Sequence, residues 1–104
     1  MARLLTEEER ADALATLPDW AWAEEARAIR RSFRFEDFSA AFGFMTRVAM
    51  AAEKADHHPE WSNVWNRVDV ALTTHSASGL TALDVALARQ IDRLAALASG
   101  GGRQ

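Results

Sequence analysis

The chain has 104 residues, with 12 basic and 15 acidic side chains, three histidines and no cysteine. Hydrophobic residues make up 49% of it and charged residues 26%, which is typical of one globular domain and excludes disorder along the whole chain. Because cysteine is absent, disulfides, zinc fingers, iron–sulfur sites and thiol catalysis are excluded together.

The net charge of −3 argues against a nucleic-acid partner, which would require a basic face. No apolar run reaches the roughly 20 residues that cross a bilayer, so we expect no membrane partner. The N-terminal segment turns acidic after Leu4 and Leu5, unlike a secretory signal, and we expect a cytoplasmic protein. Residues 1–98 are predicted to form a single domain, and residues 99–104 a flexible tail.

The first element in chain order is a helix. Thr6, followed by Glu9 three residues later, has the spacing of a capping box. Leu14 and Leu17 are expected on its inner side, and Pro18 is expected to end it.

Aromatic side chains alternate in residues 20–24, and apolar side chains fall at alternating positions in residues 29–35, which predicts two antiparallel strands. From Asp37 to about Ala55 the period becomes helical. One apolar stripe of this helix is interpreted as core and consists of Phe38, Phe42, Met45, Ala49 and Ala52; Phe44, Val48 and Ala51 are expected to widen it.

Residues 61–75 form a second β region, in which Val68, Val70, Leu72 and Thr74 are expected to point the same way. Two interpretations stay open, a hairpin that turns at residues 66–67 and one long bent strand; we favour the hairpin.

Thr81 and Asp84 have the spacing of another capping box and begin a last helix. Its expected buried stripe is Leu87, Ile91, Leu94 and Ala98. The predicted order is α-β-β-α-β-β-α, an α+β fold with a four-stranded antiparallel sheet and three helices packed on one face. Such a small sheet has two open edges, which favours a homo-oligomer.

The three histidines lie close together in the sequence, His57 and His58 after a helix and His75 after a strand. Histidine exchanges protons near neutral pH without large tuning, so the cluster is a candidate acid–base site. The ordinary alternative is that each is structural. A second alternative is an iron site of Glu53 and His57 with His75 or Asp84, although the chain has no metal-binding motif such as H-E-x-x-H.

A longer pattern runs through these residues: Glu53, His57-His58-Pro59, Trp65, His75 and Asp84. Their spacing resembles the signature of the pterin-4a-carbinolamine dehydratase family, and the similarity extends from about Thr6 to Leu97. The resemblance implies a dehydratase that converts 4a-hydroxytetrahydrobiopterin to quinonoid dihydropterin and water, in tetrahydrobiopterin recycling after an aromatic amino-acid hydroxylase.

The resemblance also implies that His57 and His75 are the acid–base pair, that His58 holds the pterin, and that the protein is a homodimer or homotetramer that needs neither metal nor cofactor. An alternative is a non-enzymatic protein-interaction module of the same fold, acting in dimerisation or as a coactivator. Whichever histidine is the acid, the reaction requires both rings to face one hollow.

Further residues are candidates for binding the substrate. Glu53 and the backbone around Thr74 could bind the polar edge of a pterin, and Trp61 or Trp65 could cover its face. Asp84 is a site candidate that could equally be only a helix cap. Glu53 could equally be a solvated helix residue, and both tryptophans could be core or interface anchors.

Overall fold

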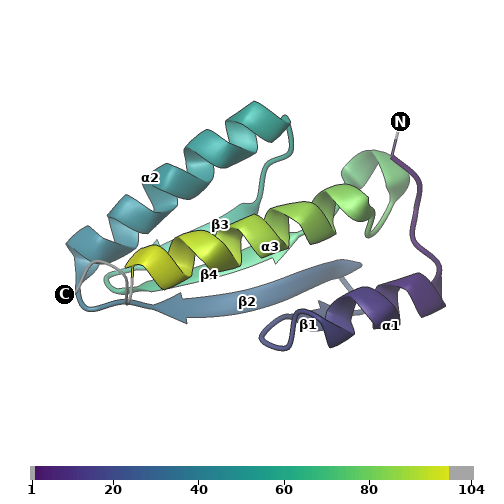
Figure 1. Ribbon diagram of the computed structural model, residues 1–104, viewed down its shortest axis with the longest axis horizontal. Helices are drawn as coiled ribbons and strands as arrows, with labels where there is room; N and C mark the ends of the chain where they lie inside the picture. Colours follow the sequence, from purple (N-terminus) through teal and green to yellow (C-terminus); the bar gives the residue numbers. More distant parts are fainter. Residues whose placement is uncertain (1, 99–104) are drawn as a thin grey trace.

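The computed structural model describes residues 2–98, so the tail expected at residues 99–104 lies outside the described residues. The elements are α1 (Glu7–Ala15), β1 (Ala21–Ala23), β2 (Ala28–Arg34), α2 (Phe38–Ala55), β3 (Glu60–Val64), β4 (Arg67–Leu72), a short 3₁₀ helix η1 (His75–Ala77) and α3 (Ala82–Ala96). Apart from η1, this is the predicted order α-β-β-α-β-β-α (Figure 1).

The strands form one antiparallel sheet in the order β1-β2-β4-β3, with β1 and β3 at its edges. Figure 1 shows α2 and α3 lying across one face of this sheet. α1 belongs to the same face, because the Arg10 guanidinium stacks 3.9 Å from the centre of the Trp22 ring, and Trp22 pairs with buried Ile29. The prediction of three helices on one face is confirmed.

The core lies between the sheet and the two longer helices. Val68, Val70 and Leu72 of β4 are buried, as is Thr74 just after it, which confirms the predicted alternation. The helices cover them with a second apolar layer: Phe44 and Val48 from α2, and Leu87, Ala88 and Ile91 from α3. β4 is paired with a strand on each side, so the position of the chain where Thr74 and His75 follow it is held by the sheet.

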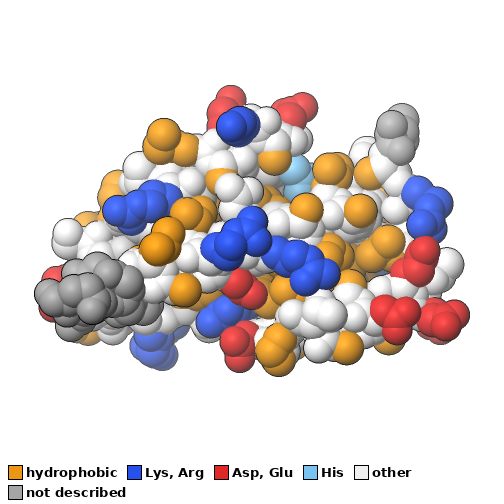
Figure 2. All heavy atoms as spheres, in the orientation of Figure 1, with side chains coloured by type: hydrophobic (Ala, Val, Ile, Leu, Met, Phe, Trp, Pro, Cys, Tyr) orange, Lys and Arg blue, Asp and Glu red, His pale blue; other side chains and the backbone are white. Residues whose placement is uncertain are grey.

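The predicted core stripe of α2 is wrong in part. Phe38 and Phe42 are 48% and 54% exposed, and Ala49 is exposed as well. Ala52 is buried as predicted, and the other buried side chains of the helix are Ala41, Phe44 and Val48. The apolar surface of α2 is wider than one stripe, and the sheet covers the half centred on Phe44 and Val48. Figure 2 shows the remaining hydrophobic side chains on the surface over α2.

The β3–β4 connection is the predicted hairpin, but the turn lies one residue earlier than expected. Val64 pairs with Arg67, so residues 65 and 66 form the turn, and Trp65 has a left-handed backbone with φ of 50°. Asn66 fixes this register with its side-chain amide, which donates to the Phe35 carbonyl at 3.0 Å. Asn63 adds a hydrogen bond to the Arg67 carbonyl at 2.9 Å.

The first helix is also shorter than predicted. α1 ends at Ala15, where the Thr16 hydroxyl donates to the Ala13 carbonyl at 2.7 Å. Leu17 is buried as expected, but it lies in the segment after the helix. Both predicted capping boxes are present, that of Thr6 with Glu9 and that of Thr81 with Asp84.

Candidate active site

The end of α2 determines where the first two histidines point. Asp56 adopts a left-handed backbone, and the amides of Asp56 and His57 donate back to the carbonyls of Glu53 and Ala52 at 3.2 and 3.1 Å. This reversal is the Schellman motif, here with aspartate where glycine is usual. His57 consequently turns inward and is only 9% exposed, whereas the exposed side chain of His58 points outward, just before Pro59.

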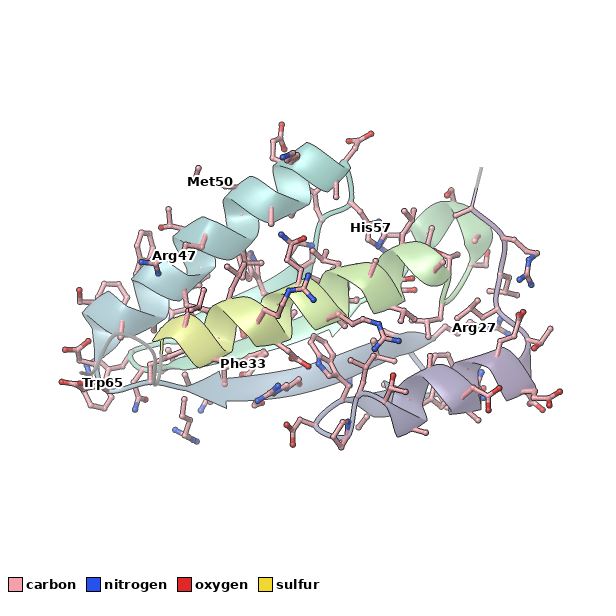
Figure 3. All side chains as sticks on the ribbon, viewed as in Figure 1. Arg27, Phe33, Arg47, Met50, His57 and Trp65 are labelled. Carbon is pink, nitrogen blue, oxygen red and sulfur yellow. The ribbon has the colours of Figure 1, made fainter. Side chains whose placement is uncertain are left out.

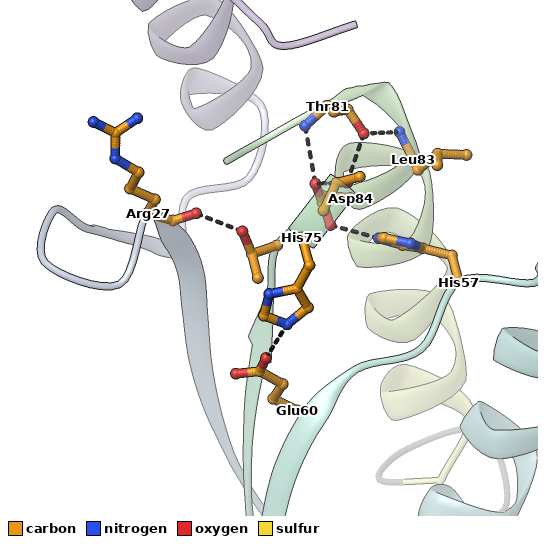
Figure 4. A network of polar contacts seen from close by, with 9 residues as sticks. Arg27, His57, Glu60, His75, Thr81, Leu83 and Asp84 are labelled. Carbon is orange, nitrogen blue, oxygen red and sulfur yellow. Dashed lines mark hydrogen bonds and ion pairs between the residues drawn. The ribbon is translucent and has the colours of Figure 1, made fainter. Parts of the chain in front are cut away.

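His57 reaches a buried carboxylate at the start of α3. Its Nε2 lies 2.6 Å from Oδ1 of Asp84, a side chain with no exposed surface. The other carboxylate oxygen accepts from the Thr74 hydroxyl at 2.7 Å and from the Thr81 amide at 2.9 Å (Figure 4). One carboxylate therefore connects the end of α2, the end of β4 and the first turn of α3.

His75 begins η1 and is largely exposed, and its Nε2 lies 2.6 Å from Oε2 of Glu60, the first residue of β3. The sequence interpretation missed Glu60. In the structure Glu60 pairs with Ala71, and Ala71, Thr73 and His75 alternate along the chain segment; this register brings Glu60 to His75 and could not be derived from local sequence. A carboxylate thus accompanies this histidine as well.

The structure does not place His57 and His75 in hydrogen-bond contact. Figure 4 shows both rings at the same end of the sheet, with Asp84 between them in this view. The hydrogen-bond network of His57 extends to Thr74, the neighbour of His75 in the chain. A hollow of about 250 Å³ is lined by His75 with Thr73 and Ser78, and His57 is not part of its wall. A hollow shared by both rings stays a prediction.

Glu53 pairs with His58 rather than with His57, at 2.9 Å between Oε1 and Nε2. Both side chains are exposed, so the pair contributes at most about 1 kcal/mol to stability. Glu53 also lines an apolar groove of about 660 Å³ along α2, and Trp61 of β3 forms part of its wall. These two binding candidates lie together.

Within one chain Trp65 is not near His57, so it does not cover the His57 ring of its own chain. His57 lies before the start of β3 and Trp65 directly after its end, and this five-residue strand is about 17 Å long. Figure 3 shows Trp65 at the far end of the molecule from His57. Trp65 is 62% exposed and makes the hairpin tip.

The arrangement of carboxylates also bears on the iron-site alternative. Within residues 2–98, no group of three histidine, aspartate or glutamate side chains is arranged to hold a metal ion. Each histidine instead has its own carboxylate: His57 has Asp84, His58 has Glu53 and His75 has Glu60.

Across the described residues 2–98, no helix has the length and apolarity needed to cross a membrane.

The protein is thus an α+β domain in which a histidine contacts a buried carboxylate where β4, α2 and α3 meet. The family model for pterin 4 alpha carbinolamine dehydratase matches residues 3–94. The chain belongs to this family.

Individual relatives agree. A Rhizorhabdus wittichii protein named "Putative pterin-4-alpha-carbinolamine dehydratase" is 68% identical over 91 residues, which is 88% of this chain and 94% of the relative. A Novosphingobium aromaticivorans protein with the same name is 60% identical, over 85% of this chain and 92% of the relative. The crystal structure of a transcriptional coactivator/pterin dehydratase from Brucella melitensis superposes with a TM-score of 0.87 at 53% identity, covering 89% of this chain and 99% of that one.

Proposed function

We propose that the protein converts 4a-hydroxytetrahydrobiopterin to quinonoid dihydropterin and water, with His57 and His75 as the acid–base pair. The observation that carries this proposal is the His57–Asp84 contact of 2.6 Å, buried at the end of α2 in a chain of this family. An imidazole held by a carboxylate can take and return a proton near neutral pH.

The reaction has two proton transfers. The bond between C4a and the hydroxyl oxygen breaks as one imidazolium protonates that oxygen, and water leaves. The other imidazole takes the proton from N5, and the electron pair of the N5–H bond forms the double bond between N5 and C4a. Either histidine can begin as the acid, so the proposal assigns the pair and leaves the order open.

The carboxylate partners give the two histidines different supports. Asp84 holds the His57 ring through a contact of 2.6 Å that is shielded from solvent. Glu60 orients His75 at the surface, where water weakens the interaction. We propose His58, Glu53 and Trp61 as substrate-binding residues. Thr74 and Asp84 serve this site by holding His57, because their side-chain hydrogen bonds are directed to the network around it.

In this proposal the reaction needs no metal or organic cofactor and recycles the pterin that an aromatic amino-acid hydroxylase releases. The protein acts as a homodimer or homotetramer. The open edges of the sheet, at β1 and β3, support self-association, because an unpaired strand exposes amides and carbonyls. Light scattering on the purified full chain measures the assembly size.

The function is tested by dehydration of freshly generated 4a-hydroxytetrahydropterin. The wild-type protein is expected to accelerate the reaction, and the double variant His57→Ala, His75→Ala to lose that acceleration while keeping its fold and assembly. Gln90→Ala, on the exposed side of α3, is the matched control. A folded wild-type protein that never accelerates dehydration contradicts the proposal and favours the interaction module.

A further inference from the structure

Thr81 lies in a chain of hydrogen bonds that ends at His57. Its Oγ1 accepts from the Leu83 amide at 3.2 Å and lies 2.8 Å from Oγ1 of Thr74. The Thr74 hydroxyl is 2.7 Å from Asp84 Oδ2, and Oδ1 of the same carboxylate meets His57 Nε2. Thr81 has no exposed surface and Thr74 is 5% exposed, so water does not compete for these groups.

Counting hydrogens gives this chain a direction. An ionised carboxylate only accepts, so the single hydrogen of the Thr74 hydroxyl is directed to Asp84. The hydrogen between the two threonines must then come from Thr81, whose oxygen remains free to accept from Leu83. With one orientation of each hydroxyl, every hydrogen bond from the Leu83 amide to Asp84 therefore has one donor and one acceptor.

The same count determines which nitrogen of His57 carries a proton. Oδ2 of Asp84 already accepts from the Thr74 hydroxyl and the Thr81 amide, and an ionised carboxylate has no hydrogen to donate from Oδ1. His57 Nε2 must therefore donate to Asp84. When the ring is neutral, its lone pair is then on Nδ1, because a neutral imidazole carries one hydrogen.

We propose that Thr81 and Thr74 are positioning residues that act through Asp84 to keep the proton of His57 on Nε2, so that Nδ1 is the atom that exchanges a proton with the substrate. This inference rests on the proposed function for the substrate step alone; the tautomer is a property of the free protein. Thr81 thus has a second role besides capping α3. A carboxylate that holds one ring nitrogen of a histidine sets which nitrogen faces the reaction.

The chain offers a matched control for the capping role. Thr6 caps α1 with the same capping box, but it is exposed and its partner is Glu9. Thr6→Val removes a cap without touching the network, whereas Thr81→Val removes a cap and a hydroxyl donor. Thr81→Ser keeps the hydroxyl. Thr74→Val, which removes the donor to Asp84 and leaves both caps, is the second variant if Thr81→Val does not fold.

The experiment is a ¹H–¹⁵N NMR measurement of the histidine ring nitrogens in the full chain at about pH 9, where an ordinary imidazole is neutral, together with dehydration kinetics. The wild type, Thr81→Ser and Thr6→Val are expected to show His57 protonated on Nε2. In Thr81→Val or Thr74→Val we expect a measurable fraction with the proton on Nδ1 and a kcat about 10-fold lower at similar KM.

Two outcomes overturn the inference: a wild-type His57 protonated on Nδ1, or folded valine variants with the wild-type tautomer and kcat. Equal loss of kcat in Thr6→Val also counts against it, because helix capping alone would then explain the effect. If the wild type has the expected tautomer but does not accelerate dehydration, the proposed function fails and the positioning of the His57 ring stands.

Discussion

His57 and Asp84 are 27 positions apart in the sequence, and Nε2 of one lies 2.6 Å from Oδ1 of the other. The contact is shielded from solvent, since the histidine side chain is 10% exposed and the aspartate not at all. It joins the end of one helix to the start of another beside the central strand of the sheet. We therefore expect both the stability of the protein and its proposed activity to depend on this pair of side chains.

Asp84→Asn is expected to lower both the stability of the protein and its dehydratase activity. The amide oxygen can still accept from Thr74 and the Thr81 amide, but the amide nitrogen then faces the donor on His57. We expect the free energy of unfolding to fall by about 1–3 kcal/mol, measured by urea denaturation. Dehydratase activity should fall with it. Unchanged stability in this variant would show that the hydrogen-bond network does not depend on the carboxylate of Asp84.

Glu60→Gln is expected to separate activity from stability. The His75–Glu60 pair is exposed, so its loss should change the free energy of unfolding by no more than about 0.5 kcal/mol. The rate of dehydration should fall because His75 loses the carboxylate that orients it. Glu8→Gln, an exposed glutamate of α1, is the control. Equal dehydration rates in Glu60→Gln and Glu8→Gln would show that Glu60 does not contribute to the activity of the site.

Asp56→Gly is expected to stabilise the protein. Asp56 has φ of 53° and ψ of 41°, a left-handed conformation that costs an ordinary residue about 1 kcal/mol, and its negative charge lies at the negative end of α2. Glycine removes both costs, so the melting temperature should rise by several degrees. Asp56→Ala removes the charge but keeps a β-carbon on the left-handed backbone, which alanine tolerates less well than aspartate, so it should gain less. A lower melting temperature for the glycine variant would contradict this account of the helix end.

We expect Glu9 to make the N-terminal segment sensitive to acid. Hydrogen bonds from Arg3 and from the Thr6 amide lower the pKa of Glu9 from 4.5 to about 2. Since the folded-state pKa is the lower one, this stabilisation is complete above about pH 5 and is lost as the pH falls towards 2. In Glu9→Gln the stability should depend less on pH over that range. Parallel curves for variant and wild type would contradict the prediction.

Local features of the sequence predicted the elements well. Both capping boxes and the alternation of β4 depend on residues within a few positions of one another, and each is present. α2 was harder because it is apolar on more than one side. Periodicity indicates that such a helix has an apolar surface, but only the packing of the sheet decides that Phe44 is buried and Phe42 exposed.

The sequence was sufficient to predict which residues belong to the candidate site. It was not sufficient to predict which side chains contact one another. The spacing of His57 and His75 pointed to the family, and the chain belongs to it. That His57 meets Asp84 and His75 meets Glu60 depends on where α3 and β3 lie, and that His58 meets Glu53 depends on the chain reversal at Asp56. No local rule places Glu60 beside a residue 15 positions away, so it was missed.

The central claim is that His57 and His75 act on one substrate ring. The most direct measurement is a crystal structure of the full-length protein with a bound, non-reacting dihydropterin analogue. The account predicts a ring nitrogen of each histidine within about 3.2 Å of the analogue's N5 or of the position of the departing hydroxyl. An analogue bound against only one histidine, or in a pocket that neither ring reaches, would contradict it.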